Sequence, residues 1–282
     1  MNDMNERNKW NPQFRFSDVL EDFNDWLEWR DAASRTAEQS LSFERIAYGA
    51  HDRQWIETTE CGPVQSAVMP VFIHGGYWRS LSAEDHRCVL TGLSSLGRRC
   101  ANAEYRLMPE FRLDDLVGDA VAALDRLATL YSNDTRFLLV GHSAGAHLAI
   151  SAALMAAPRA GLSDRLAGVV GISGVYDLAP VAKSFLQDEI GLTDEEIRSH
   201  SLIGASVGVP LLCVVGGDET DEFKRQSLAM AESAEAGHLV VRGAHHLSIL
   251  SDLNSQKSPL IDALGVWLNN VSHPAEVDTI SS

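Results

Sequence analysis

The sequence feature that most constrains this chain is the stretch 141–145, G-H-S-A-G, which has the pattern G-x-S-x-G. An apolar run typical of a strand, residues 135–140, precedes it, and small helix-forming residues, 144–157, follow it. A serine between a strand and a helix is the context of a nucleophile elbow, a sharp turn that exposes the hydroxyl. Side chains at the two glycines would crowd such a turn. The pattern predicts that Ser143 is a nucleophile at a helix amino end, where free N–H groups favour negative charge.

A second motif follows the buried strand predicted over residues 67–73. It is H-G-G-Y-W at 74–78. A glycine pair at a strand end lets successive N–H groups face a ligand, and H-G-G hydrolases use such groups as an oxyanion hole. We expect this hole to consist of the backbone N–H groups of Gly76, Tyr77 and Ala144. Each donor would lower the reaction barrier by about 3 kcal/mol.

The residues around this motif are the first candidates for a substrate pocket, namely His74, Gly75 and Trp78. Between a structural and a catalytic role for His74, the structural one is favoured, in which the side chain braces the loop. The side chains of Tyr77 and Trp78 either wall the pocket or pack in the core.

Strand and helix patterns alternate along most of the chain, which predicts an α/β fold with a mostly parallel, doubly wound sheet. The domain is expected over residues 41–272, after an N-terminal arm and lid helix over 1–40 and before a flexible tail over 273–282. The expected strands lie within 42–58, 67–73, 100–107, 135–140, 168–174, 209–216 and 238–241, and the expected helices within 84–97, 114–131, 144–157, 221–236 and 259–271.

Two segments are candidate lids. The charged stretch 179–205 interrupts the alternation and is interpreted as a small helical lid inserted after a strand. Residues 1–15 are expected to be a loose arm, and a helix is expected from Ser17 onward because apolar residues recur at helical spacing. This helix carries Trp26 and Trp29, and it either lines a pocket for an aromatic substrate or packs on the core. Packing is favoured because aromatic stripes usually pack.

Two further residues complete a candidate catalytic triad with Ser143. Asp218 and His246 each follow a predicted strand, and reactive groups gather at the carboxyl ends of parallel strands. Histidine can take the serine proton, and a buried carboxylate can hold the imidazole in the required tautomer. Asp218 competes with Glu219, Asp221 and Asp177 for the carboxylate role, and His246 competes with His245 for the role of base.

Composition excludes several classes of function. The net charge is −16 and no basic patch is present, which argues against a nucleic-acid partner. No apolar run is long enough to span a membrane, and the first residues lack a signal-peptide core, so a cytoplasmic location is expected.

The four cysteines form no C-x-x-C motif, which indicates neither a metal site nor a disulfide framework. No G-x-G-x-x-G follows the first strands, which excludes a dinucleotide enzyme. No cofactor is expected.

These motifs together resemble the kynurenine formamidase (arylformamidase) branch of the α/β-hydrolases. The resemblance covers most of residues 40–270 and is carried by H-G-G-Y-W at 74–78, G-H-S-A-G-A-H-L-A at 141–149, G-G-D-E-T at 216–220 and G-A-H-H-L at 243–247. It implies an α/β-hydrolase fold, a triad of Ser143, Asp218 and His246, and an oxyanion loop at 74–78.

The resemblance further implies a serine hydrolase that cleaves an aryl formamide or short acyl amide such as N-formylkynurenine through an acyl-enzyme. A carboxylesterase acting on small aryl or alkyl esters or carbamates is the alternative. A binding protein built on an inactive hydrolase fold is a third hypothesis, disfavoured because no triad member is missing. The expected partner is a small-molecule substrate, and a homodimer is left open.

Overall fold

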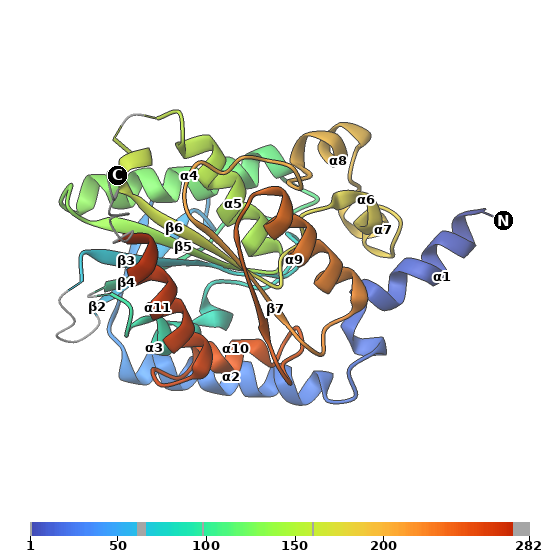
Figure 1. Ribbon diagram of the computed structural model, residues 1–282, viewed down its shortest axis with the longest axis horizontal. Helices are drawn as coiled ribbons and strands as arrows, with labels where there is room; N and C mark the ends of the chain where they lie inside the picture. Colours follow the sequence, from blue (N-terminus) through green and yellow to red (C-terminus); the bar gives the residue numbers. More distant parts are fainter. Residues whose placement is uncertain (1, 61–65, 98, 160, 273–282) are drawn as a thin grey trace, which may run out of the picture.

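The computed structural model describes residues 2–60, 66–97, 99–159 and 161–272. In this part of the chain, eight strands form one sheet in the order β1-β2-β4-β3-β5-β6-β7-β8 (Figure 1). β1 and β2 run antiparallel to their neighbours, and the other neighbouring strands run parallel. The strands are β1 (Phe43–Ala47), β2 (Trp55–Glu60), β3 (Val68–Ile73), β4 (Arg99–Ala103), β5 (Arg136–His142), β6 (Leu166–Ile172), β7 (Leu211–Gly216) and β8 (Gly237–Val241).

Helices cover both faces of this sheet (Figure 1). One face carries α4 (Leu113–Leu130), α5 (Ala144–Ala156) and α9 (Asp221–Ser233), and the other carries α2 (Phe23–Ser40), α3 (Val89–Leu93), α10 (Ile249–Leu253) and α11 (Pro259–Ser272). Alternate residues of β5 enter the two cores, with Phe137 and Leu139 on the first side and Leu138 and Val140 on the second. Strands buried on both faces read as continuous apolar runs, which is the pattern seen in the sequence. The predicted doubly wound, mostly parallel α/β fold is confirmed.

The N-terminal segment differs from the prediction. Residues expected to be a loose arm form helix α1 (Asn2–Phe14), followed by the short 3-10 helix η1 (Phe16–Asp18). Helix α2 begins at Phe23 rather than near Ser17, because the chain first turns where the N–H groups of Val19 and Leu20 both donate to the carbonyl of Phe16. The buried rings of Phe14 and Phe16 anchor this turn on the domain.

Three short helices occupy most of the stretch interpreted as a lid, and they follow β6 as expected. They are α6 (Leu178–Val181), α7 (Leu186–Ile190) and α8 (Asp194–His200). Helix α1 contacts them through an ion pair between Arg7 and Asp188 and a hydrogen bond from the N–H of Phe185 to Asn11. Movement of this segment as a lid stays a prediction. The predicted tail 273–282 and Cys61 lie outside the described residues.

No helix in the described ranges is long and apolar enough to cross a membrane.

Two glycines allow a matched test of the packing around the elbow. A Cβ on Gly145, in the first turn of α5, would lie 2.0 Å from the carbonyl oxygen of Ile73, whereas a Cβ on Gly118, in α4, would meet nothing within 4 Å. We expect Gly145→Ala to lower the free energy of unfolding by about 3 kcal/mol because it overpacks backbone. Gly118→Ala should raise it by about 0.5–1 kcal/mol because alanine is the better helix former. Urea unfolding of both variants measures this, and equal midpoints would contradict it.

Candidate active site

Ser143 lies in a strained turn between β5 and α5. Its backbone has φ 56° and ψ −121°, in the region that residues other than glycine rarely adopt. The N–H of Ser143 donates to Ile172 of β6 (2.9 Å), and its carbonyl accepts from the N–H of Ala146 (3.0 Å). The sequence prediction of an elbow-shaped turn is therefore confirmed. The N–H of Ala144, the first residue of α5, has no intrahelical acceptor at this position.

The loop after β3 lies directly against this turn. A Cβ on Gly75 would be 3.0 Å from the Cβ of Ser143. The backbone then takes positive φ at Gly76 (113°), Tyr77 (51°) and Trp78 (59°). The carbonyl of Gly76 is turned toward the N–H groups of the residues that follow, and within the described chain the N–H groups of Gly76 and Tyr77 make no hydrogen bond. This arrangement leaves donors beside Ser143, as an oxyanion hole requires.

His246 is paired with Glu219 and not with Asp218. The Nδ1 of His246 donates to Oε2 of Glu219 at 2.9 Å, and both side chains are buried. Since a carboxylate can only accept, the proton of a neutral imidazole lies on Nδ1 and Nε2 keeps its lone pair. The expectation that Asp218 holds the imidazole is wrong.

The turn after β7 explains this correction. The N–H of Glu219 donates to the carbonyl of Gly216 (3.3 Å), and the N–H of Asp218 donates to Ala244 (2.9 Å). Asp218 is thereby placed at the exposed corner of the turn, and Glu219 folds back over the strand end. The carboxylate of Glu219 also accepts from the N–H of Gly216 (2.9 Å) and from the hydroxyl of Ser173.

Two neighbouring histidines have supporting positions. The Nε2–H of His142 donates to the backbone carbonyl of His246 (2.9 Å), and the two rings lie 4.7 Å apart. Burial, together with the charge of His246, lowers the pKa of His142 well below its usual value, so His142 is neutral. His245 points away from the serine, with its Nδ1 accepting from the N–H groups of Leu247 and Ser248. The choice of His246 over His245 agrees with this geometry.

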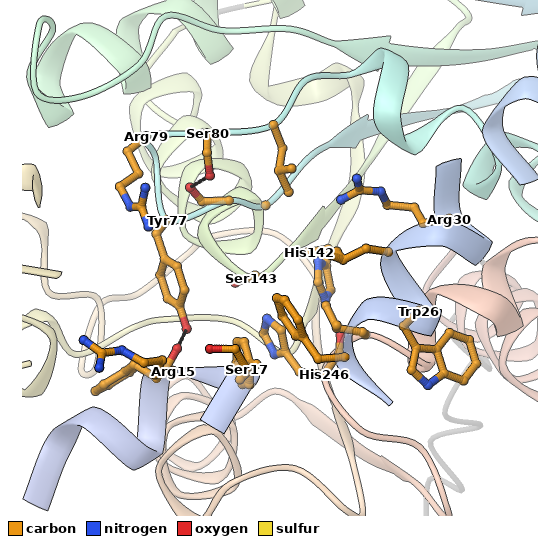
Figure 2. Close-up of a pocket in the computed structure, with 18 of the residues that line it drawn as sticks. Arg15, Ser17, Trp26, Arg30, Tyr77, Arg79, Ser80, His142, Ser143 and His246 are labelled. Atoms are coloured by element: carbon orange, nitrogen blue, oxygen red, sulfur yellow. Dashed lines mark hydrogen bonds between the residues drawn. The ribbon is translucent and has the colours of Figure 1, made fainter. Parts of the chain in front are cut away.

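Ser143 and His246 line a single cavity of about 580 Å³ whose walls are mainly aromatic and aliphatic (Figure 2). Its aromatic walls come from four separate segments of the chain, and they are Phe14, Phe16, Phe23, Trp26, Tyr77 and Phe185. Phe16 stacks on the ring of His246 with 4.1 Å between centroids. The hydroxyl of Tyr77 donates to the carbonyl of Phe14 (2.6 Å) and ties the loop after β3 to the N-terminal segment.

The N-terminal segment therefore packs on the core of the domain and also lines the cavity. The aromatic pattern of the sequence favours packing over lining, and it does not by itself indicate Phe14, Phe16 or Phe23 as pocket residues. The aromatic residues of 14–29 are the signal that could have found them.

Of the residues first proposed for the pocket, only Gly75 lines it. His74 is fully buried below the loop, where its Nδ1 donates to the carbonyl of Gly75 (2.7 Å) and its Nε2 lies 3.2 Å from Glu104. Burial opposes ionisation of Glu104, but the charge and hydrogen bond of His74, followed by the charge of Arg53, lower its pKa below the usual value. Trp78 is also fully buried, against His147, because the positive φ values turn its side chain into the core. His74 thus braces the loop, as predicted.

Comparison with known proteins adds independent information. A family model described as alpha/beta hydrolase fold matches residues 70–234. The chain is 23% identical to a kynurenine formamidase of Danio rerio over 87% of each chain, and 24% identical to one of Salmo salar over 78% of this chain and 76% of that one.

Solved structures agree on the fold. A protein of Silicibacter sp. TM1040 proposed to be a thioesterase matches with a TM-score of 0.80 and 22% identity, over 89% of this chain and 97% of that chain. A mutant of esterase E40 matches with a TM-score of 0.65 and 22% identity, over 83% and 86% of the two chains. The resemblance to the kynurenine formamidase branch is confirmed as a similarity of sequence. Because the family model spans more than half of the 282 residues, this chain belongs to the alpha/beta hydrolase fold family and is a hydrolase.

Proposed function

We propose that this protein is a serine hydrolase that cleaves an aryl formamide, or another short acyl amide of the N-formylkynurenine type, through an acyl-enzyme. The observation that carries the proposal is that Ser143 and His246 line one aromatic cavity while His246 is held by the buried carboxylate of Glu219. The sequence similarity to kynurenine formamidases supports this substrate class.

In the first half of the reaction, Oγ of Ser143 attacks the acyl carbon and its proton passes to Nε2 of His246. The negative oxygen of the tetrahedral intermediate is bound by the N–H groups of Gly76, Tyr77 and Ala144. Glu219 stabilises the imidazolium because its carboxylate already accepts from Nδ1. The C–N bond then breaks, and the proton on Nε2 passes to the departing arylamine nitrogen.

In the second half, a water molecule attacks the acyl-serine ester. His246 takes a proton from this water and returns it to Oγ of Ser143 when the ester bond breaks. The acid and the free enzyme are released. An arylamine leaves more readily than an alkylamine, so an aryl amide is within the reach of this chemistry.

The cavity favours a small acyl group and an aromatic leaving group. Gly75 lies against Ser143, so the loop leaves little space on that side of the nucleophile. The opposite walls are aromatic, and aromatic rings pack favourably against one another.

A substrate panel tests this proposal. We expect N-formylkynurenine to be hydrolysed with a kcat/KM at least about 10-fold above that of p-nitrophenyl acetate, because the aromatic walls contribute binding energy in the transition state. Steady-state kinetics of formamides, carbamates and esters on the same preparation measures this ratio. Turnover of esters without any turnover of formamides would overturn the proposal and favour the carboxylesterase alternative.

A further inference from the structure

The cavity contains a buried cation that the proposed reaction does not use. Arg30 lies on α2, its side chain is 9% exposed, and it lines the same cavity as Ser143 and His246. Figure 2 shows its guanidinium turned inward from α2, beside His142.

The other two arginines along the described cavity wall have different surroundings. Arg15 is 39% exposed and lies over the ring of Phe185. Arg79 is 33% exposed and forms an ion pair with Glu189 at 2.6 Å. Arg30 is therefore the most buried of the three.

The hydrogen bonds of Arg30 leave part of its guanidinium unused. Nε (3.1 Å) and Nη2 (2.6 Å) both donate to the same oxygen, Oδ1 of Asp31, whose side chain is 45% exposed. Nη1 makes no hydrogen bond within the described part of the chain. A guanidinium has five N–H donors and stays charged in proteins, so this site can still bind an anion.

Two of the described histidines on the cavity wall, His86 and His142, carry no positive charge that would compete with Arg30. Burial, then the charges of His74 and Arg30, lower the pKa of His86 well below its usual value. His142 is neutral for similar reasons, with Arg30 contributing. Both histidines line the cavity in their neutral form, so the positive charge on this wall belongs to Arg30.

A buried charge with incomplete pairing is costly, and an anionic group that enters the cavity would remove that cost. The chain as a whole carries a net charge of −16 and repels anions. A local cation would therefore decide whether a negatively charged substrate is accepted.

We propose that Arg30 is a specificity-determining residue that binds a carboxylate on the side chain of the aryl formamide substrate. This proposal rests on the proposed function. The carboxylate would sit at Nη1 while the formyl group faces Ser143 and the ring packs on the aromatic walls.

A pair of substrates isolates this interaction. One is a formanilide with a carboxylate on its side chain, and the other is the same molecule with a neutral carboxamide in place of the carboxylate. A charge-assisted hydrogen bond to a buried guanidinium predicts that the kcat/KM ratio of acid to carboxamide is about 30 for the unmodified protein. Arg30→Gln should bring this ratio to about 1, and Arg30→Lys should keep a ratio of about 5, because a lysine is charged but has no planar fork.

Two other variants control for charge and stability. Arg35 is exposed on the same helix and outside the cavity, so Arg35→Gln makes the same change of charge and should leave the ratio at its original value. Asp31→Asn removes the carboxylate that partly neutralises Arg30, and it should raise the ratio severalfold. A merely destabilised protein would not show a higher ratio of acid to carboxamide. Asp31→Asn and Arg30→Lys therefore test whether Arg30 binds the carboxylate even if Arg30→Gln does not fold.

An unchanged ratio in Arg30→Gln, or a fall in Asp31→Asn, would overturn the role of Arg30. If no formamide is cleaved, the same comparison is made with phenyl acetates bearing the carboxylate or the carboxamide. A ratio on these esters that depends on Arg30 would support its role although the formamidase proposal had failed. Formamide cleavage with no preference for the acid would overturn Arg30 alone.

Discussion

Ser143→Ala is expected to lower kcat for the best substrate by about 10⁵-fold, because the proposed reaction loses its nucleophile and its acyl-enzyme cannot form. Residual turnover would come from the proposed oxyanion donors and from substrate binding, which the substitution leaves in place. The measurement is initial-rate kinetics with the wild type and the variant at the same substrate concentrations. A fluorophosphonate probe should label Ser143 in the wild type and leave the variant unlabelled.

Ser151→Ala is the matched control for this variant. Ser151 lies on the same helix, α5, and its buried hydroxyl has no hydrogen-bond partner in the described part of the chain. The substitution is chemically identical and should leave kcat within about twofold, because it removes no interaction with the substrate. Full activity of Ser143→Ala would reject the serine mechanism, and an unlabelled wild type would favour a binding protein on a hydrolase fold.

The main features of the fold are specified by local sequence patterns, each of which allows only one kind of backbone structure. The run 135–140 and the two glycines at 141 and 145 predict the strand, the turn and the helix, because a Cβ at either glycine would strike backbone within 2.2 Å. The H-G-G-Y-W loop is likewise placed beside the serine, since β3 and β5 are neighbours in the sheet. The carboxyl ends of adjacent parallel strands meet at one edge, and this rule brings the two motifs together.

Other features depend on side-chain directions that a sequence does not contain. Helix α10 has only five residues, which is too short for a periodic pattern that would predict it. The aromatic cavity is assembled from segments distant in sequence, among them Phe16 near the N-terminus and Phe185 just before α7. Such contacts are set by packing of the whole chain rather than by local periodicity, so the pocket residues were the least predictable part of the site.

The carboxylate of the candidate triad is a second feature that the sequence alone does not identify. Asp218 and Glu219 are adjacent, and both follow a strand and two glycines. The sequence therefore does not distinguish which of the two carboxylates holds the imidazole. The turn decides between them, since it exposes Asp218 and directs Glu219 toward His246. The different positions of Asp218 and Glu219 predict different effects of their substitutions on kcat.

Glu219→Gln is expected to lower kcat by about 10³–10⁴-fold, whereas Asp218→Asn should change it by less than about twofold. The amide of the glutamine cannot stabilise the imidazolium, and its NH₂ group can donate to Nδ1, which would place the imidazole proton on Nε2 and block the acceptance of the proton from Ser143. Asp218 is exposed and does not contact His246, so its charge has little effect on the reaction.

Both variants remove one carboxylate from the same turn, so they are matched in charge and position. Circular dichroism and urea unfolding should first establish that Glu219→Gln is folded, because Glu219 also accepts from Gly216 and Ser173. The pH dependence of kcat/KM adds a readout that a structural defect would not give. Loss of the Glu219 carboxylate should change this pH dependence, because the imidazolium loses its stabilising negative charge. If Asp218→Asn proved inactive and Glu219→Gln active, the geometry of the turn would not describe the working enzyme.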